Sequence, residues 1–182
     1  MSNAIKEVST IDKQFYTMLR ANIGRFVKAA GVAHDRVGLR VLDVAPQAHE
    51  GAKPHFPRAT VETLDISEDS GANYIADICR NNENTIPNEH FDCVICTEVL
   101  EHTLQPFAAV AEIKRLLKRG GFAFVSTPFN FRIHGPLPDC WRFTEHGLRA
   151  LFADFEIVEL NALEDENRFL MPIHYTLVAR KT

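Results

Sequence analysis

The sequence EVLEH, residues 98–102, places two carboxylates and an imidazole on one face of a helical turn, because residues three and four apart lie side by side. Glu98, Glu101 and His102 therefore converge, and His134, which follows the next expected strand, can approach the same point. Carboxylate oxygens with imidazole nitrogens suit Mg²⁺, Mn²⁺, Fe²⁺ or Zn²⁺. In the alternative without a metal, Glu98 contacts a cofactor, Glu101 caps the helix, His102 orders the turn and His134 is a candidate general base.

A second candidate for chemistry is the loop PFNFRIHGPLPDCWRF, residues 128–143, in which aromatic rings alternate with arginines. Long loops in compact domains are usually functional, and this composition suits a planar or anionic acceptor. The alternative is a satellite apolar core, stiffened by three prolines. The residues expected to line an acceptor pocket are Phe131, Arg132, Trp141 and Arg142. The candidate acid–base groups are His102, His134 and Asp139.

Three aspartates, Asp43, Asp65 and Asp77, lie within or at the ends of successive expected strands. In open α/β sheets, ligands bind beyond the carboxyl ends of the strands. A carboxylate after the second strand can accept hydrogen bonds from both ribose hydroxyls, and one after the third can accept from an adenine amino group. Ile66 and Ile78 would supply apolar walls for the base. For each aspartate taken singly, the alternative is a helix cap or a solvated turn.

The chain has no lysine in a G-x-x-x-x-G-K-[ST] loop, which argues against a nucleoside triphosphate. The aspartate pattern suits a nucleoside without a pyrophosphate.

Apolar periodicity predicts the elements that must position these residues. Helical spacing covers residues 10–30, with Gly31 as the expected stop, and also residues 104–118 and 144–153, the last capped by Thr144. The expected strands are LRVLDVA, ATVETLDI, ANYIADI, FDCVICTEV, GFAFVSTPF, FEIVELNAL and IHYTLVAR. Several are nearly continuous apolar runs, as in parallel strands buried on both faces, and their alternation with helices predicts an α/β three-layer fold.

Two connections, residues 67–71 and 79–90, are short or polar and do not predict full helices. One face of the sheet is therefore expected to be thinly covered. The N-terminal helix would cover it, or a partner subunit such as a second copy in a homodimer.

The composition is that of one soluble domain of 182 residues, with 46% hydrophobic residues and a net charge of −4. No basic stripe is present, which argues against nucleic acid as the partner. No apolar run approaches the ~20 residues of a membrane span, and the N-terminus lacks an apolar signal core, so the expected location is cytoplasmic. Cys93 and Cys96 form a C-x-x-C, but strand residues three apart point in opposite directions, so buried, reduced thiols are expected.

The run FDCVICTEVLEHTLQPFAAVAEIKRLLKRGGFAFVSTPF resembles the middle of class I S-adenosylmethionine-dependent methyltransferases. The resemblance covers about residues 39–160, and PDCWRFTEHGL is similar to a segment after the fifth strand in a subset of these enzymes. It implies a Rossmann-like three-layer α/β sandwich, with a seven-stranded, mostly parallel sheet and an antiparallel last strand. We expect a single domain with an N-terminal helical lid at 1–35, a cofactor-binding half at 36–127 and an acceptor-side half at 128–182.

The loop after the first strand departs from the family pattern, since DVAPQAHEG replaces D-x-G-x-G-x-G. Small or turn-forming residues would leave room for the methionine end of S-adenosylmethionine, which carries no pyrophosphate, but tolerance of positive φ is lost. The expected cofactor contacts are Asp43, Ala45, Pro46, Gln47, Asp65, Ile66, Asp77, Ile78, Thr97 and Glu98.

The expected activity is methyl transfer to oxygen or nitrogen of a small-molecule acceptor. The E-x-x-E-H element with a later histidine is similar to that of small-RNA 2′-O-methyltransferases, and partly to that of ubiquinone-pathway O-methyltransferases. This likeness implies that Glu98, Glu101, His102 and His134 hold Mg²⁺ or Mn²⁺. The alternative is a methyltransferase-like binding module or partner subunit that has lost its chemistry. A nicotinamide-dependent oxidoreductase is disfavoured because G-x-G-x-x-G is missing.

Overall fold

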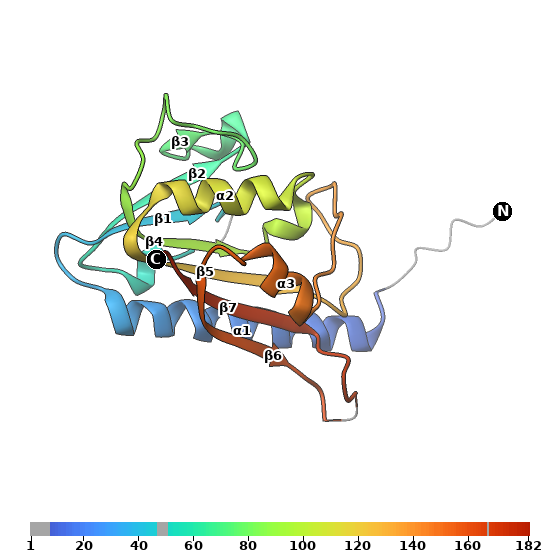
Figure 1. Cartoon of the computed structure of the whole chain (residues 1–182). Helices are drawn as coiled ribbons and strands as arrows, with labels where there is room; N and C mark the ends of the chain where they lie inside the picture. Colours follow the sequence, from blue (N-terminus) through green and yellow to red (C-terminus); the bar gives the residue numbers. More distant parts are fainter. Residues whose placement is uncertain (1–7, 47–50, 167) are drawn as a thin grey trace.

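The computed structural model describes residues 8–46, 51–166 and 168–182. Its seven strands form one sheet in the order β3-β2-β1-β4-β5-β7-β6 (Figure 1). The strands are β1 Arg40–Val44, β2 Thr60–Asp65, β3 Tyr74–Ile75, β4 Phe91–Thr97, β5 Leu117–Pro128, β6 Glu156–Leu163 and β7 His174–Arg180. Strands β1 to β5 pair in parallel, and β7 runs antiparallel to both of its neighbours. The expected sheet is confirmed.

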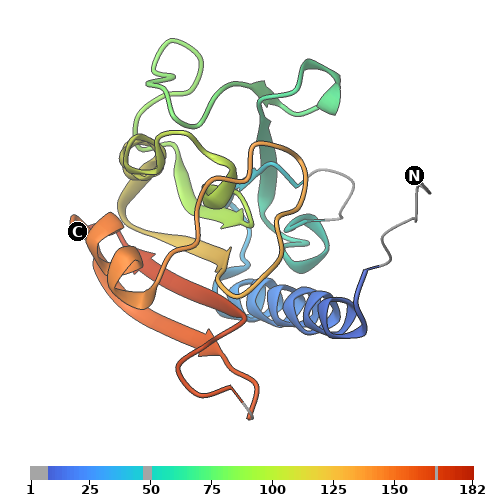
Figure 2. The same cartoon turned by 90° about the vertical axis from the view of Figure 1, so that its right-hand side faces the viewer.

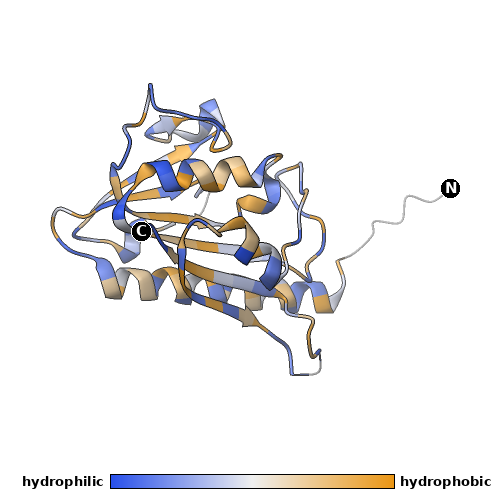
Figure 3. Cartoon of the chain, in the orientation of Figure 1, coloured by the Kyte–Doolittle hydropathy of each residue, from blue (hydrophilic) through white to orange (hydrophobic). Residues whose placement is uncertain are grey.

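The helices lie on the two faces of this sheet. The long helix α1, Thr10–His34, covers one face, and α2, Pro106–Leu116, and α3, Glu145–Leu151, cover the other (Figure 2). Leu19, Ile23 and Val27 of α1 pack against one side of the central strands, and a second apolar cluster lies beneath α2 and α3. Apolar residues are frequent along the central strands (Figure 3). The three-layer architecture is confirmed.

Helix α1 is longer than its sequence predicted. Gly31, the expected stop, lies inside the helix, which ends at His34. A Cβ at position 31 would lie 2.1 Å from the carbonyl oxygen of His55, in the 3₁₀ turn Lys53–His55. The glycine therefore serves close packing between this turn and α1, and does not end the helix.

Helix α2 is shorter than the expected helix at 104–118. It begins at Pro106, which needs no amide donor in the first turn. Leu104 and Phe107, which share the apolar helical spacing of residues 104–118, are 73% and 66% exposed, so this apolar stripe is not buried at its N-terminal end. Thr144 caps α3 as expected, because its side-chain oxygen accepts from a backbone amide of the first turn. That helix ends at Leu151, two residues early.

The edge beyond β2 lacks long helices, as expected. Residues 66–73 and 76–90, which the structure describes throughout, contain one 3₁₀ turn, Glu68–Ser70, and no α-helix. The third strand is only two residues long, because the chain turns at Asp77, whose carboxylate accepts from the amide of Cys79. Within the described part of the chain, no helix combines the length and the apolar character needed to cross a membrane.

Cys93 and Cys96 lie on opposite sides of the sheet, which confirms the alternation expected for a strand. Burial raises the pKa of Cys93 to about 12 and raises that of Cys96 as well. All four cysteines are free thiols. This C-x-x-C is therefore a pair of buried strand residues.

Candidate active site

The carboxyl ends of β1, β2 and β4 meet at one edge of the sheet, beside two cavities of about 690 and 380 Å³. The larger cavity lies over the ends of β1 and β2 and the segment after β3. The smaller one lies between α1, the end of β4 and the loop at 128–143. The two cavities share Ala45, Glu98, His102 and Pro136 in their linings. This is the crevice where open α/β sheets bind ligands.

The larger cavity has acidic and apolar walls. Asp65 and Asp77 line it, and each uses Oδ1 to accept from a backbone amide two residues on, at 2.8 Å. These turns fix both carboxylates and leave Oδ2 of each available to other partners. Oδ2 of Asp77 lies 3.6 Å from Nε of Arg80. Ile66 is 70% exposed at this cavity and Ile78 is buried at its base. Asp65, Ile66, Asp77 and Ile78 thus line one cavity together.

The smaller cavity begins at the altered loop after β1. Asp43 lines it, is 4% exposed, and accepts from the amide of Ala52 at 2.6 Å. Burial raises the pKa of Asp43 to about 6. Pro46 and Thr97 also line this cavity. Gln47, the remaining loop residue expected to contact the cofactor, lies outside the described residues.

Two residues show how this loop forms with few glycines. Ala45 has φ 50°, the left-handed conformation that glycine adopts most readily. Gly51 has φ 60°, and a Cβ there would lie 2.1 Å from Oδ2 of Asp43. Gly51 thus lies where a side chain would meet Asp43, and Ala45 takes a left-handed conformation without being a glycine.

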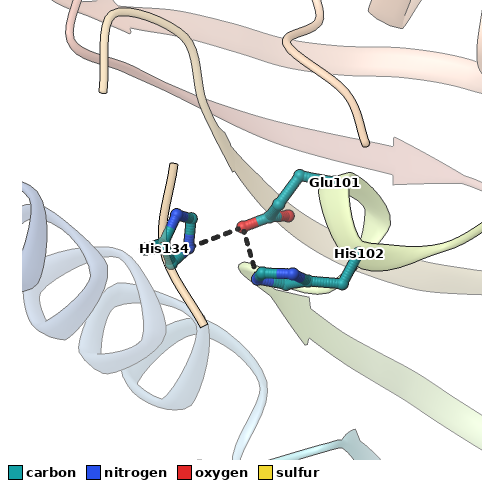
Figure 4. A group of neighbouring side chains, drawn as sticks. All are labelled: Glu101, His102 and His134. Carbon is teal, nitrogen blue, oxygen red and sulfur yellow. Dashed lines mark ion pairs between the residues drawn. The ribbon is translucent and has the colours of Figure 1, made fainter. Parts of the chain in front are cut away.

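A buried carboxylate faces two imidazoles beside this cavity. The side chain of Glu101 is fully buried, and neither of its oxygens has a hydrogen-bond partner among the described residues. Its Oε1 lies 3.8 Å from Nε2 of His102 and 3.7 Å from Nε2 of His134 (Figure 4). Burial, and then the charge of Glu98, raise the pKa of Glu101 well above its ordinary value. An unpartnered buried carboxylate is costly, so this group calls for a positive partner.

The two imidazoles are oriented by acceptors on their far sides. Nδ1 of His102 lies 2.9 Å from the carbonyl oxygen of Pro138, and Nδ1 of His134 lies 3.0 Å from Oδ2 of Asp139. A carbonyl and a carboxylate accept, so each Nδ1 donates, and the tautomer with its proton on Nδ1 has the Nε2 lone pair on the side of Glu101. Histidine ligands of metals are typically held in this way. The ligand atoms of Glu101, His102 and His134 lie within 4.8 Å of one another.

Asp139, expected to be a catalytic group, lies behind His134 and does not line either cavity. Both of its oxygens accept from Arg142, one at 2.8 Å, and one accepts from the amide of His134 at 2.9 Å. The Arg142 guanidinium holds the pKa of Asp139 well below its usual range. The placement of Asp139 makes it an orienting group for His134, which itself lines the smaller cavity.

Glu98 was expected in the metal-binding group, but the cluster whose ligand atoms meet contains only Glu101, His102 and His134. Oε1 of Glu98 accepts from Oγ of Ser126 at 2.9 Å and lies 2.8 Å from Nε2 of His174. His174 was missed at the sequence level, because a histidine in an expected strand carries no signal of its own.

The loop at 128–143 is anchored to the EVLEH turn. The amides of Cys140 and Trp141 donate to the carbonyl oxygen of Glu101 at 2.7 and 3.1 Å, and the indole of Trp141 donates to that of Thr103 at 2.7 Å. This anchoring brings His134 beside Glu101, although they are far apart in the sequence.

Of the four residues expected in an acceptor pocket, Phe131 lines the smaller cavity. Trp141 and Arg142 instead hold the loop through the contacts described above, and Arg132 lies 4.0 Å from Asp12 of α1. Helix α1 supplies lining residues that the sequence did not single out. They are Tyr16, Leu19, Arg20, Ile23, Gly24 and Val27.

With this geometry established, comparison with known proteins identifies the family. A family profile described as a methyltransferase domain matches residues 14–163. The chain belongs to this family, and its sheet is that of the class I S-adenosylmethionine-dependent methyltransferases.

The curated relatives are O-methyltransferases of ubiquinone biosynthesis. The protein of that name from Haemophilus ducreyi is 33% identical over 88 residues, which is 47% of this chain and 31% of the relative. The one from Xanthomonas oryzae pv. oryzae is 32% identical over 94 residues, 50% of this chain and 35% of the relative. The matches therefore span about a third of the length of these relatives.

Solved structures share the fold at lower identity. A methyltransferase from Bacillus halodurans, described as putative in its name, superposes with a TM-score of 0.64 at 16% identity, covering 88% of this chain and 99% of that one. The 1,6-didemethyltoxoflavin-N1-methyltransferase of Burkholderia thailandensis, solved with S-adenosylhomocysteine, gives 0.63 at 17% identity, covering 98% and 93%.

Proposed function

We propose that this protein transfers the methyl group of S-adenosylmethionine to an oxygen of a small-molecule acceptor, and that a divalent ion held by Glu101, His102 and His134 assists the transfer. The observation that carries the proposal is the unpartnered, fully buried carboxylate of Glu101, with two oriented imidazole Nε2 atoms 3.7 and 3.8 Å away. The names of the curated relatives, which are O-methyltransferases, support oxygen over nitrogen.

The larger cavity is assigned to the nucleoside of the cofactor, with Asp65 at the ribose and Asp77, Ile66 and Ile78 at the base. A carboxylate makes strong hydrogen bonds to hydroxyl groups, and the apolar side chains provide the walls for a flat ring. The methionine end is assigned to the smaller cavity, beside Asp43, Ala45, Pro46 and Thr97. Glu98 lines both cavities and would lie at their junction.

Acceptor binding is assigned to the rest of the smaller cavity. Its wall from α1 contains Tyr16 and Arg20, and Phe131 faces it from the loop. Arg20 is half-buried and has no ion pair with a residue in the described part of the chain. A planar acceptor with an acidic group fits rings and a guanidinium. Helix α1 would then act as the helical lid expected for residues 1–35.

The reaction moves a methyl carbon from sulfur to oxygen. The carbon–sulfur bond breaks with its electron pair staying on sulfur, the carbon–oxygen bond forms, and the hydroxyl proton leaves to solvent. The cofactor supplies the reactive sulfonium, and a bound divalent ion would supply Lewis acidity that lowers the pKa of an acceptor hydroxyl. The protein supplies the positions of these groups, which is a large part of the rate of a two-substrate reaction.

The test combines binding with turnover. Calorimetry should show that S-adenosylhomocysteine binds in the presence of a chelator, because none of the side chains assigned to the ribose and the base belongs to the Glu101 cluster. Methyl transfer to 3,4-dihydroxybenzoate, which offers adjacent hydroxyls and a carboxylate, should stop in chelator and return with Mg²⁺ or Mn²⁺. His134→Gln should abolish this rescue, whereas His146→Gln, on the exposed surface of α3, should behave as wild type.

The second candidate is a binding module without chemistry, and the altered loop after β1, with Ala45 at φ 50°, favours it. It predicts no binding of S-adenosylhomocysteine at millimolar concentration. Full activity in chelator would instead remove the ion from the proposal and leave His134 as the candidate general base.

A further inference from the structure

A partly buried chain of hydrogen bonds connects α1 to Glu98. His174, the first residue of β7, has a fully buried side chain. Its Nε2 lies 2.8 Å from Oε1 of Glu98, and its Nδ1 lies 3.0 Å from Nδ2 of Asn22 on α1. The three residues come from β7, the end of β4 and α1, and the ring of His174 makes a polar contact at both nitrogens.

The neighbours of His174 fix which nitrogen carries its proton. Arg25 donates to Oδ1 of Asn22 at 3.3 Å, so the amide nitrogen of Asn22 faces the imidazole. An amide nitrogen only donates, and therefore Nδ1 of His174 accepts. The proton of the neutral ring is then on Nε2 and is donated to Glu98. Ser126 donates to the same oxygen at 2.9 Å.

These contacts determine how Glu98 is presented. Both donors act on Oε1, while Oε2 makes no hydrogen bond to any residue in the described ranges. The side chain is 13% exposed and lines both cavities. Glu98 also has φ 55°, which is rare for a residue with a long side chain and persists when the surroundings fix it. Oε2 is therefore the oxygen of Glu98 that is left without a protein donor at a residue shared by the two cavities.

We propose that His174 and Asn22 are positioning residues, which hold Glu98 so that its free oxygen faces the positively charged part of the cofactor. The inference rests on the proposed assignment of the two cavities to S-adenosylmethionine. The cofactor is a cation at sulfur and its product is neutral there, so a fixed carboxylate favours the charged form. Because Glu98 is already held in place, its charge needs no rearrangement when the ligand binds. His174 and Asn22 therefore contribute to cofactor binding, although neither residue lines a cavity.

The experiment compares two ligands that differ in charge at the position of the cofactor's sulfur atom. Sinefungin carries an amine where the cofactor carries its methylated sulfur, and S-adenosylhomocysteine carries a neutral thioether. Calorimetry should show that His174→Leu lowers the preference for sinefungin over S-adenosylhomocysteine by about tenfold, because a hydrogen bond to a charged group is lost. His174→Gln should keep most of the preference, since its amide can donate to Glu98. Thr176→Val is the matched control, as a buried polar residue two positions along β7.

A second measurement shows directly which nitrogen of His174 faces Glu98 as a donor. Nitrogen NMR of His174 should show a protonated Nε2 and an unprotonated Nδ1, and Asn22→Leu should change that pattern. Asn22→Leu should also lower the ligand preference, which keeps the test decisive if His174→Leu fails to fold.

An unchanged preference in both variants, or a proton on Nδ1 in wild type, would overturn the inference while leaving the proposed function intact. Failure of the wild-type protein to bind either ligand would overturn both.

Discussion

Replacing Glu101 by methionine should stabilise the protein when no divalent ion is available. The substitution removes a fully buried carboxylate whose two oxygens lack partners among the described residues, and substitutes an apolar side chain of similar length. An unsatisfied buried polar group costs about 1–3 kcal/mol, so we expect a gain of about 2 kcal/mol in the free energy of unfolding. For a chain of 182 residues, this corresponds to a rise in Tm of about 4–8 °C in chelator.

A divalent ion should reverse the order of stability. At an Mn²⁺ concentration of about 100 times the dissociation constant, wild type gains about 2.7 kcal/mol and Glu101→Met gains nothing. Calorimetric unfolding with chelator and with Mn²⁺ measures both effects. Glu112→Met is the matched control, because Glu112 is also buried but its carboxylate accepts from Arg115 and Asn82. It should lose stability in both conditions, by about 3 kcal/mol or more.

The reasoning is refuted if Glu101→Met is less stable than wild type in chelator, since the carboxylate would then have a favourable environment without an ion. Equal Mn²⁺ responses of the two proteins would refute the assignment of Glu101 as a ligand.

Further predictions concern the residues around the cofactor cavities. Because burial raises the pKa of Asp43 from 3.8 to about 6, the stability it contributes is present below about pH 4 and is lost as the pH rises through 6. Denaturant unfolding of wild type should therefore lose up to about 3 kcal/mol more than that of Asp43→Asn between pH 4 and 7, and parallel curves would contradict the shift. Gly51→Ala should weaken S-adenosylhomocysteine binding at least about tenfold, because its Cβ would meet Asp43, and should lower stability by about 2 kcal/mol or more. Gly38→Ala, at φ 83° in open space, should carry only the backbone cost of about 1 kcal/mol, and equal effects of the two would exclude the steric explanation. Asp65→Ala should reduce S-adenosylhomocysteine affinity by at least about tenfold with the fold intact, and unchanged affinity would remove Asp65 from the ribose site.

Much of the fold is encoded in patterns that need no tertiary information. The apolar runs around Asp43 and Cys93 predicted buried parallel strands, and Thr144 predicted the start of α3. These signals are local, because strand alternation and helix capping depend on neighbours within a few residues. The ends of the helices and strands were predicted less well. Strand β3 ends at Ile75 because the chain turns around Asp77, and one side-chain hydrogen bond fixes that turn.

The candidate site also has a part that the sequence predicted and a part that it did not. Glu101 and His102 are adjacent in the sequence, and His134 follows the neighbouring strand, so their meeting could be predicted from the order of parallel strands. The long-range partners of the neighbouring Glu98 could not be predicted. Glu98 contacts His174, 76 residues away, and His174 contacts Asn22, 152 residues away, so their proximity depends on how β7 and α1 are placed against the sheet. The sequence alone determined which groups are available and which strand ends carry them. The tertiary structure decided which acidic groups receive hydrogen bonds and which, like Glu101, are buried without them, because burial and long-range pairing are properties of the packed chain and not of any short segment.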